Sequence, residues 1–297
     1  MNTFLVRTLS GIVFAAILIG GIVGGPITYT LLFAAITAAM LWEFAVNVNT
    51  HFDASVNKLI NTMAGVFLFV AIAGFCADMV PPRAFIPYLI SIIYLLISEL
   101  YLRASNPLKN WSLAFASQLY IALPLSTLNV LAFSFDRQAG QTYYNWVLPL
   151  SVFFFLWLND TGAYCVGSLL SKRFPAKLFP RISPKKSWIG SIGGGLFVLL
   201  LAILLWHLFP TAMPIHRHGW LAGLSPAAQS LVEWIGLGIV VCVFGTWGDL
   251  VESLFKRQLG IKDSGNMMPG HGGILDRFDS SLLAIPAAVL YLYTLNF

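Results

Sequence analysis

Apolar stretches of about 20 residues recur along this chain, and they restrict its fold more than any other feature. A helix of about 20 residues spans the hydrocarbon core of a bilayer. Only 10% of the residues are charged, and the mean hydropathy is +0.80, which excludes an ordinary soluble domain. We therefore predict an all-α polytopic membrane protein with about nine transmembrane helices. The stretches lie at roughly 8–24, 27–46, 59–77, 84–102, 112–134, 146–168, 188–209, 231–255 and 280–296.

The first stretch allows two interpretations, a cleaved signal peptide or a membrane helix that is retained. It follows Arg7 and runs into IGGIVGG without an A-x-A-like cleavage site. A second apolar stretch begins almost at once, which is unusual after a signal peptide. We interpret it as a retained membrane helix.

The basic residues are distributed unevenly between the two sides that nine spans would define. With the N-terminus in the cytoplasm, 14 of the 17 Lys and Arg residues face the cytoplasm, and Arg83, Arg137 and Arg217 face outward. This asymmetry follows the positive-inside rule. We predict a multi-pass protein of the cell (inner) membrane, with the N-terminus, the basic loops and a polar active site on the cytoplasmic side, where nucleotides are found.

The two halves of the chain differ in their content of ionisable groups. We predict a single membrane domain, 1–297, in which residues 1–145 form a helical scaffold and residues 146–297 form the catalytic half. Glu43 and Glu99, near the ends of the second and fourth spans, are exceptions in the first half. We interpret both as interfacial residues or structural hydrogen-bond partners and not as catalysts.

Residues 253–279 form the most densely polar stretch of the chain. Asp276 and Asp279 lie at i,i+3 and can face a divalent cation, while Gly270, Gly272 and Gly273 allow close approach to phosphate. Such a mixture suits metal-assisted phosphoryl or nucleotidyl transfer. Just upstream, a helical face would carry Asp249, Ser253 and Lys256, although such spacing also occurs in ordinary surface pairs. The cations available for phosphate are Lys256, Arg257, Lys262 and Arg277.

Two upstream features are also candidates. Asp160 lies inside the sixth span, with Tyr164, Gly167 and Ser168 on the same helical face. An intramembrane carboxylate indicates a functional site or, alternatively, a hydrogen bond that fixes helix packing.

The second upstream candidate is Lys185, Lys186 and Ser187, which precede a helix that opens with glycines. They could seat a phosphate at a helix N-terminus. They could equally form a topogenic basic loop before a closely packed helix.

The polar stretch resembles the signature of a known family. Its pattern is Ser253-x-x-Lys256-Arg257-x4-Lys262-Asp263, followed by Pro269-x-His271-Gly272-Gly273-x-x-Asp276-Arg277-x-Asp279. This is similar to the phosphatidate cytidylyltransferases (CDP-diacylglycerol synthases). Residues 159–164 and 183–188 also resemble that family, so the similarity covers roughly 155–285. The chain departs from the pattern at Ser168, Ile189 and Met268, where the family usually has Arg, a polar residue, and Ile or Leu.

The resemblance implies transfer of CMP from CTP to phosphatidic acid, giving CDP-diacylglycerol and pyrophosphate, with Mg²⁺ as cofactor. Asp249, Asp276 and Asp279 would act as catalytic metal ligands, and Asp160 would shape a polar cavity open to the bilayer. A homodimer is implied by the family alone. Substrate binding would fall to Asp160, Lys185, Lys186, Ser187, Ser253, Lys256, Arg257, Lys262, His271 and Arg277.

Three other functions compete with this hypothesis. A related enzyme could use CTP with a polyprenol phosphate or another lipid phosphate. A secondary transporter would explain Asp160 and the glycine-interrupted helices, and a structural scaffold would leave the polar stretch without a role. Nucleic acid is not an expected partner.

Overall fold

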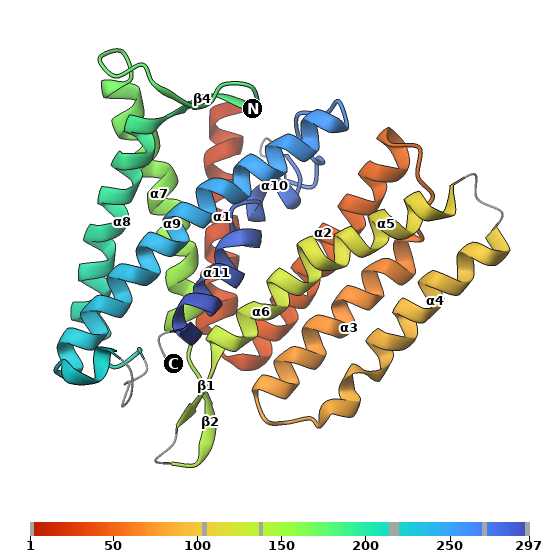
Figure 1. Cartoon of the computed structure of the whole chain (residues 1–297), viewed down its shortest axis with the longest axis horizontal. Helices are drawn as coiled ribbons and strands as arrows, with labels where there is room; N and C mark the ends of the chain where they lie inside the picture. The colour runs from red at the N-terminus through yellow and green to blue at the C-terminus, as the bar shows by residue number, and fades with distance from the viewer. Residues whose placement is uncertain (1–2, 103–105, 137–138, 214–219, 269–271, 295–297) are drawn as a thin grey trace. The chain divides into compact units, whose positions relative to one another are not determined.

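The structure is a computed structural model that describes residues 3–102, 106–136, 139–213, 220–268 and 272–294. Helices dominate it (Figure 1). The chain forms two compact units, which we describe separately. Unit 1 comprises Met1–Trp146 and Phe255–Phe278, and unit 2 comprises Val147–Leu254 and Asp279–Phe297. The first boundary lies next to the predicted division at 145/146, but residues 255–278 belong with the N-terminal helices.

The elements of unit 1 follow one another with short connections. They are α1 (Thr3–Val23), α2 (Pro26–His51), α3 (Lys58–Cys76), η1 (Pro82–Phe85), α4 (Ile86–Leu102), α5 (Pro107–Ser117), the π-helical turn η2 (Gln118–Ala122), α6 (Leu123–Ala132), β1 (Phe133–Asp136), β2 (Gln141–Tyr144) and α10 (Leu275–Phe278). Helix α9 (Pro226–Gln258) contributes to both units. Unit 2 adds α7 (Val147–Leu170), β3 (Lys177–Phe179), β4 (Ser183–Ser187), α8 (Trp188–Leu208), η3 (Trp220–Gly223) and α11 (Ser281–Thr294).

Within the described residues, each of the nine predicted apolar stretches coincides with one helix or, at 112–134, with the run α5–η2–α6, and the prediction of a helical membrane protein is confirmed. Within the described part of the chain, six helical segments are long and apolar enough to cross a membrane. The count of nine spans stays a prediction for α1, α7 and α11. The six segments are Pro26–His51, Lys58–Cys76, Pro82–Leu102, Pro107–Ala132, Trp188–Leu208 and Pro226–Gln258.

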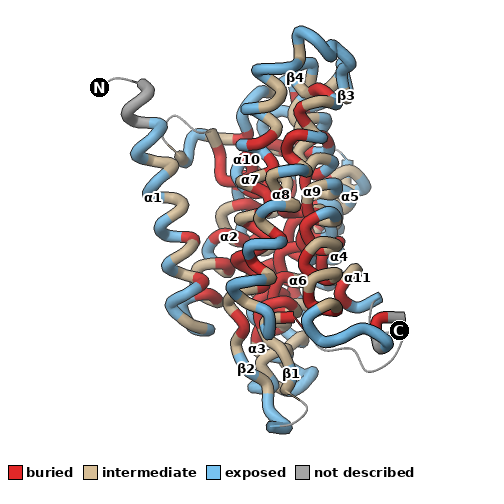
Figure 2. The backbone as a smooth tube through the Cα atoms, turned by 90° about the vertical axis from the view of Figure 1, so that its left-hand side faces the viewer, coloured by how far each residue is buried: buried red, intermediate tan, exposed pale blue. Residues whose placement is uncertain are grey.

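The helices of unit 1 expose apolar side chains along their length. On α4, Ile90, Ile93 and Leu100 are 61%, 54% and 71% exposed. Figure 2 shows that exposed backbone positions are not confined to the loops but recur along helices such as α1. An apolar exterior of this kind is costly in water but matches the acyl chains of a bilayer.

Two short antiparallel hairpins are exceptions to the all-helical prediction. Strands β1 and β2 pair from Phe133 opposite Tyr144 to Asp136 opposite Gln141. Aromatic contact stabilises this hairpin, since the Phe133 and Tyr144 rings lie 5.6 Å apart. The second hairpin pairs β3 with β4, so Lys185 and Lys186 lie on a strand and not in an irregular loop.

Aromatic rings fix residues 255–278 against α2 inside unit 1. The rings of Phe44 on α2 and Phe255 on α9 stack with centroids 5.0 Å apart and planes 10° apart. Phe278 on α10 meets Phe33 of α2 edge-on at 6.5 Å. Aromatic pairs of this kind add to the free energy gained from apolar burial. These residues, 255–278, are called the polar segment below. The polar segment is therefore held at both of its ends.

Candidate active site

The polar segment begins in the last turn of α9, and a glycine terminates that helix. Lys256 and Arg257 occupy the last turn of α9, where the helix dipole favours cations. Gly260 follows with φ +69°, and the N–H of Ile261 donates back to the carbonyl of Lys256 at 3.0 Å. A left-handed glycine at this position is a common helix terminator. It turns the chain away from the helix into residues 261–274.

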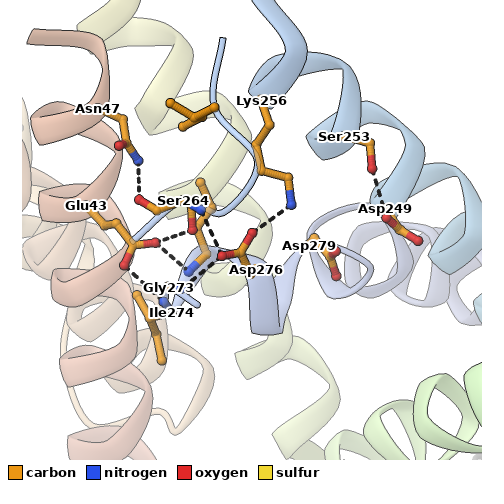
Figure 3. Close-up of polar contacts among 12 residues, drawn as sticks. Glu43, Asn47, Asp249, Ser253, Lys256, Ser264, Gly273, Ile274, Asp276 and Asp279 are labelled. Carbon is orange, nitrogen blue, oxygen red and sulfur yellow. Dashed lines mark hydrogen bonds and ion pairs between the residues drawn. The ribbon is translucent and has the colours of Figure 1, made fainter. Parts of the chain in front are cut away.

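Asp276 lies at the centre of the polar contacts in unit 1 (Figure 3). One carboxylate oxygen accepts from the Lys256 ammonium at 2.7 Å. The other accepts from the backbone N–H groups of Ser264 and Gly273, both at 2.8 Å. The side chain is buried, so these bonds replace the water it has lost. Asp276 thus joins the end of α9 to both sides of the loop at 264–273.

The pKa of Asp276 reflects these contacts. Burial alone would raise it, but the hydrogen bonds from Lys256, Gly273 and Ser264 and the charge of Lys256 outweigh burial, so the pKa lies below its usual 3.8. A carboxylate with a lowered pKa stabilises the fold above the pKa of the unfolded chain. That stabilisation is lost as the pH falls through the folded-state pKa.

The lowered pKa of Asp276 predicts how the effect of Asp276→Asn on thermal stability changes in acid. The thermal unfolding temperatures of parent and variant in detergent should differ by a constant amount between pH 8 and 6. The difference should narrow once the pH falls below about 4, where an unfolded Asp takes up its proton. A scan in matched buffers checks this, and a difference that widens in acid would contradict it.

A second cluster lies in unit 2 and consists of Lys186, Asp249 and Ser253. The ammonium of Lys186 forms an ion pair with one oxygen of Asp249, and the Ser253 hydroxyl donates to the other at 3.2 Å. Lys186 and Asp249 are 26% and 29% exposed, so both remain accessible to a ligand. The predicted helical pairing of Asp249 with Ser253 is present. We call these residues the Asp249 cluster.

The neighbours of Lys186 differ in their roles. Ser187 is buried and caps α8, accepting a hydrogen bond from the Gly190 N–H at 3.2 Å. This is the usual position of a serine at a helix start. Lys185 is exposed on β4. A phosphate-binding role for Ser187 would therefore compete with its capping bond, whereas Lys185 can reach a ligand without losing a contact of that kind.

The other predicted residues are mostly at the surface of their own unit. Asp160 and Tyr164 are both exposed on α7, as their shared helical face predicts, and Asp279 accepts from the Ser280 N–H at 2.5 Å. His271 lies outside the described residues. Three of the predicted phosphate-binding cations are exposed in unit 1, which leaves their charges available for phosphate: Arg257, Lys262 and Arg277.

The predicted metal ligands are distributed over the two units, with Asp276 in unit 1 and Asp249 and Asp279 in unit 2. Among the described residues, no group of three or more His, Cys, Asp or Glu side chains is close enough to hold a metal ion. Carboxylate oxygens are nevertheless the donors that Mg²⁺ prefers. Asp276 accepts three hydrogen bonds of about four possible, which leaves room for one more ligand bond.

Two residues of the N-terminal half contact the polar segment and were not predicted to do so. Glu43 accepts hydrogen bonds from Ser264, Ile274 and Leu275, and Asn47 donates to the Ser264 carbonyl. The interpretation of Glu43 as a structural hydrogen-bond partner is confirmed, but its partner is the polar segment itself. Their i,i+4 spacing at the end of an apolar span was the available signal.

The fold and these contacts define a helical membrane protein whose polar segment combines a fixed carboxylate with exposed cations. The chain belongs to the Cytidylyltransferase family, whose model matches residues 5–295. A phosphatidate cytidylyltransferase of Haemophilus influenzae is 33% identical over 296 residues, covering 94% of this chain and 95% of the relative.

Relatives from other bacteria give the same family. Phosphatidate cytidylyltransferases of Staphylococcus epidermidis and Staphylococcus aureus are each 32% identical, over 282 and 284 residues, covering 95% of this chain and 96% of each relative. The family resemblance seen in the motifs is therefore confirmed. It also extends well beyond 155–285, because the matches include the N-terminal half.

Proposed function

We propose that this protein transfers CMP from CTP to phosphatidic acid, forming CDP-diacylglycerol and releasing pyrophosphate. The observation that carries the proposal is a buried carboxylate, Asp276, fixed beside Lys256 in a segment whose other cations are exposed. Relatives that match nearly the whole chain bear the name of this activity. Membership of this family favours the transferase over the transporter and scaffold hypotheses.

The protein itself contributes little covalent chemistry to this reaction. A phosphate oxygen of the lipid attacks the α-phosphorus of CTP, and the bond from that phosphorus to the bridging oxygen of the β-phosphate breaks. Both reactants are anions, so alignment and charge neutralisation govern the rate. Arg257, Lys262 and Arg277 are exposed cations suited to the nucleotide and pyrophosphate oxygens.

The remaining roles are assigned by chemical type. Lys185 and Lys186 would bind the lipid phosphate or the nucleotide, and Asp160 would border a polar cavity open to the bilayer. Ser253, Ser187 and His271 belong to the proposed substrate-binding set. Asp249, Asp276 and Asp279 would hold Mg²⁺, which would neutralise charge on the transferring phosphates. We further propose a cytoplasm-facing site in the cell membrane, on the positive-inside asymmetry, and a homodimer on the family resemblance.

The test is conversion of phosphatidic acid to CDP-diacylglycerol by purified protein in detergent, with labelled CTP. Product should form with Mg²⁺, and a chelator should stop its formation reversibly. A parallel reaction with a polyprenol phosphate separates the two lipid substrates. A folded protein that converts neither lipid, or that prefers the polyprenol phosphate, would overturn the proposal.

Asp249 offers a prediction about the cofactor. Asp249→Asn should raise the Mg²⁺ concentration for half-maximal activity by about 10- to 100-fold, since it removes a charge from a ligand candidate paired with Lys186. A Mg²⁺ titration of the rate measures this. Asp78→Asn is the control, because Asp78 is an exposed carboxylate in the turn after α3 and belongs to neither the proposed ligands nor the substrate-binding set. Equal Mg²⁺ requirements in parent and Asp249→Asn would remove Asp249 from the proposed ligands.

A further inference from the structure

Helix α2 carries two polar side chains, Glu43 and Asn47, that lie one turn apart and form hydrogen bonds with the polar segment of unit 1. Glu43 is buried, and one of its oxygens accepts from the Ser264 hydroxyl at 2.5 Å and from the Leu275 N–H at 3.1 Å. Its other oxygen accepts from the Ile274 N–H at 3.0 Å. One carboxylate thus holds both sides of the loop between Ser264 and Ile274, more than 220 positions away in the sequence.

The backbone around Glu43 is shaped to receive it. A Cβ atom at Gly273 would lie 2.1 Å from one Glu43 oxygen, and a Cβ atom at Gly265 would lie 2.5 Å from the other. No real side-chain carbon approaches an oxygen so closely, so both positions depend on glycine as long as Glu43 keeps its place. The loop and the carboxylate therefore fit one another on both sides.

Glu43 and Asp276 share the same backbone. Ser264 donates its N–H to Asp276 and its hydroxyl to Glu43, and its carbonyl accepts from the Asn47 amide at 2.6 Å. Along the chain, the N–H of Gly273 bonds Asp276, whereas the next two N–H groups bond Glu43. Any displacement of Glu43 would move the donors that place the Asp276 carboxylate (Figure 3).

We propose that Glu43, assisted by Asn47, is a positioning residue that sets the geometry of Asp276 and Lys256 for catalysis. A buried carboxylate is an expensive anchor when apolar packing would suffice to hold helices together. Among the described residues, its three donors all come from the polar segment, and none comes from a neighbouring membrane helix. The inference rests on the proposed function for its effect on rate, but its effect on the loop does not depend on any substrate.

Glu43→Gln tests the proposal with almost no change in volume. An amide presents one acceptor oxygen and one NH₂ group, so at least one of the backbone N–H groups of Ile274 and Leu275 would face another donor. We expect kcat to fall by about 10- to 100-fold, as when supporting residues of an active site are altered. The KM for phosphatidic acid should change less than threefold.

Glu99→Gln is the matched control. Glu99 is equally buried in unit 1, on α4, and accepts from the Asn110 amide at 3.0 Å, so it joins membrane helices and not the polar segment. The Glu99→Gln substitution should lower the thermal unfolding temperature without lowering kcat more than twofold. If both variants lost kcat in the same proportion, Glu43 would be a stabilising residue only and the proposal would be wrong.

Hydrogen–deuterium exchange supplies a readout that needs no catalysis. In Glu43→Gln, the peptide covering 262–276 should exchange faster, while peptides of α4 and α5 stay unchanged. If the parent transferred no CMP, this result would still support the positioning of the loop, and only the proposed reaction would fail. Unchanged exchange at 262–276 would overturn the inference.

Asn47→Ala provides a second test of the proposal in case Glu43→Gln does not fold. This variant removes the hydrogen bond from Asn47 to the Ser264 carbonyl and leaves the Glu43 carboxylate in place. We therefore expect kcat to fall about threefold to tenfold, with faster hydrogen–deuterium exchange at Ser264. Normal kcat and normal exchange in that variant would count against the proposal.

Discussion

Asp276→Asn should lower kcat/KM for CMP transfer by about a thousand-fold while the protein remains folded. The amide would lose the negative charge that Lys256 neutralises at 2.7 Å. It could also no longer receive two backbone N–H groups on one side and a cation on the other without placing its NH₂ group against a donor. The measurement is initial rate with CTP and phosphatidic acid in detergent, next to Asp78→Asn as an exposed-carboxylate control.

The pairing of Asp276 with Lys256 gives a second test of the same prediction. If the two side chains act as one unit, Lys256→Met combined with Asp276→Asn should be little worse than Asp276→Asn alone, since coupled residues are not additive. Independent effects that multiply would show that the ion pair is incidental. Retention of more than a tenth of the parent rate in Asp276→Asn would remove Asp276 from the catalytic machinery.

Gly272→Ala should lower kcat/KM by about a hundred-fold, for a steric reason. Gly272 has φ +86°, and a Cβ atom there would lie 2.6 Å from the Asp276 oxygen that accepts from Ser264 and Gly273. Relief of this clash requires the carboxylate to move and both hydrogen bonds to lengthen. The rate should therefore fall even at temperatures where the variant is still fully folded.

Gly260→Ala separates this clash from backbone strain. Gly260 also has a left-handed φ, +69°, but nothing lies within 4 Å of its Cβ position. Both alanines incur a left-handed backbone penalty of about 1–2 kcal/mol, and only Gly272→Ala meets Asp276. We expect Gly260→Ala to lower the unfolding temperature and to keep most of the activity. Equal activity losses in the two variants would mean that strain, and not the contact with Asp276, is responsible.

Several features of this protein could be predicted because they depend on neighbouring residues in the chain. Apolar stretches of membrane length gave the helix positions, since bilayer thickness fixes the length of a spanning helix. Helical spacing placed Asp249 beside Ser253 and Asp160 on the face of Tyr164, as the structure has them. The signature between 253 and 279 indicated the family, which the matches across the whole chain confirm.

Other features depend on contacts between distant segments, and sequence spacing carries no record of those. The hairpins at 133–144 and 177–187 escaped prediction because they are short and lie between apolar helices. The grouping of 255–278 with the N-terminal helices follows from ring contacts such as Phe44 with Phe255. Glu43 could be recognised as unusual, but its partners could not be identified.

The sequence by itself determined the membrane class, the approximate helices and the family of this protein, because each is encoded in local pattern. Only the tertiary structure decided which groups satisfy the buried carboxylates. Glu43 binds backbone N–H groups of the loop, and Asp276 binds Lys256 and two further N–H groups. The physical reason is that a buried charge must find donors wherever folding brings them, irrespective of their distance along the chain.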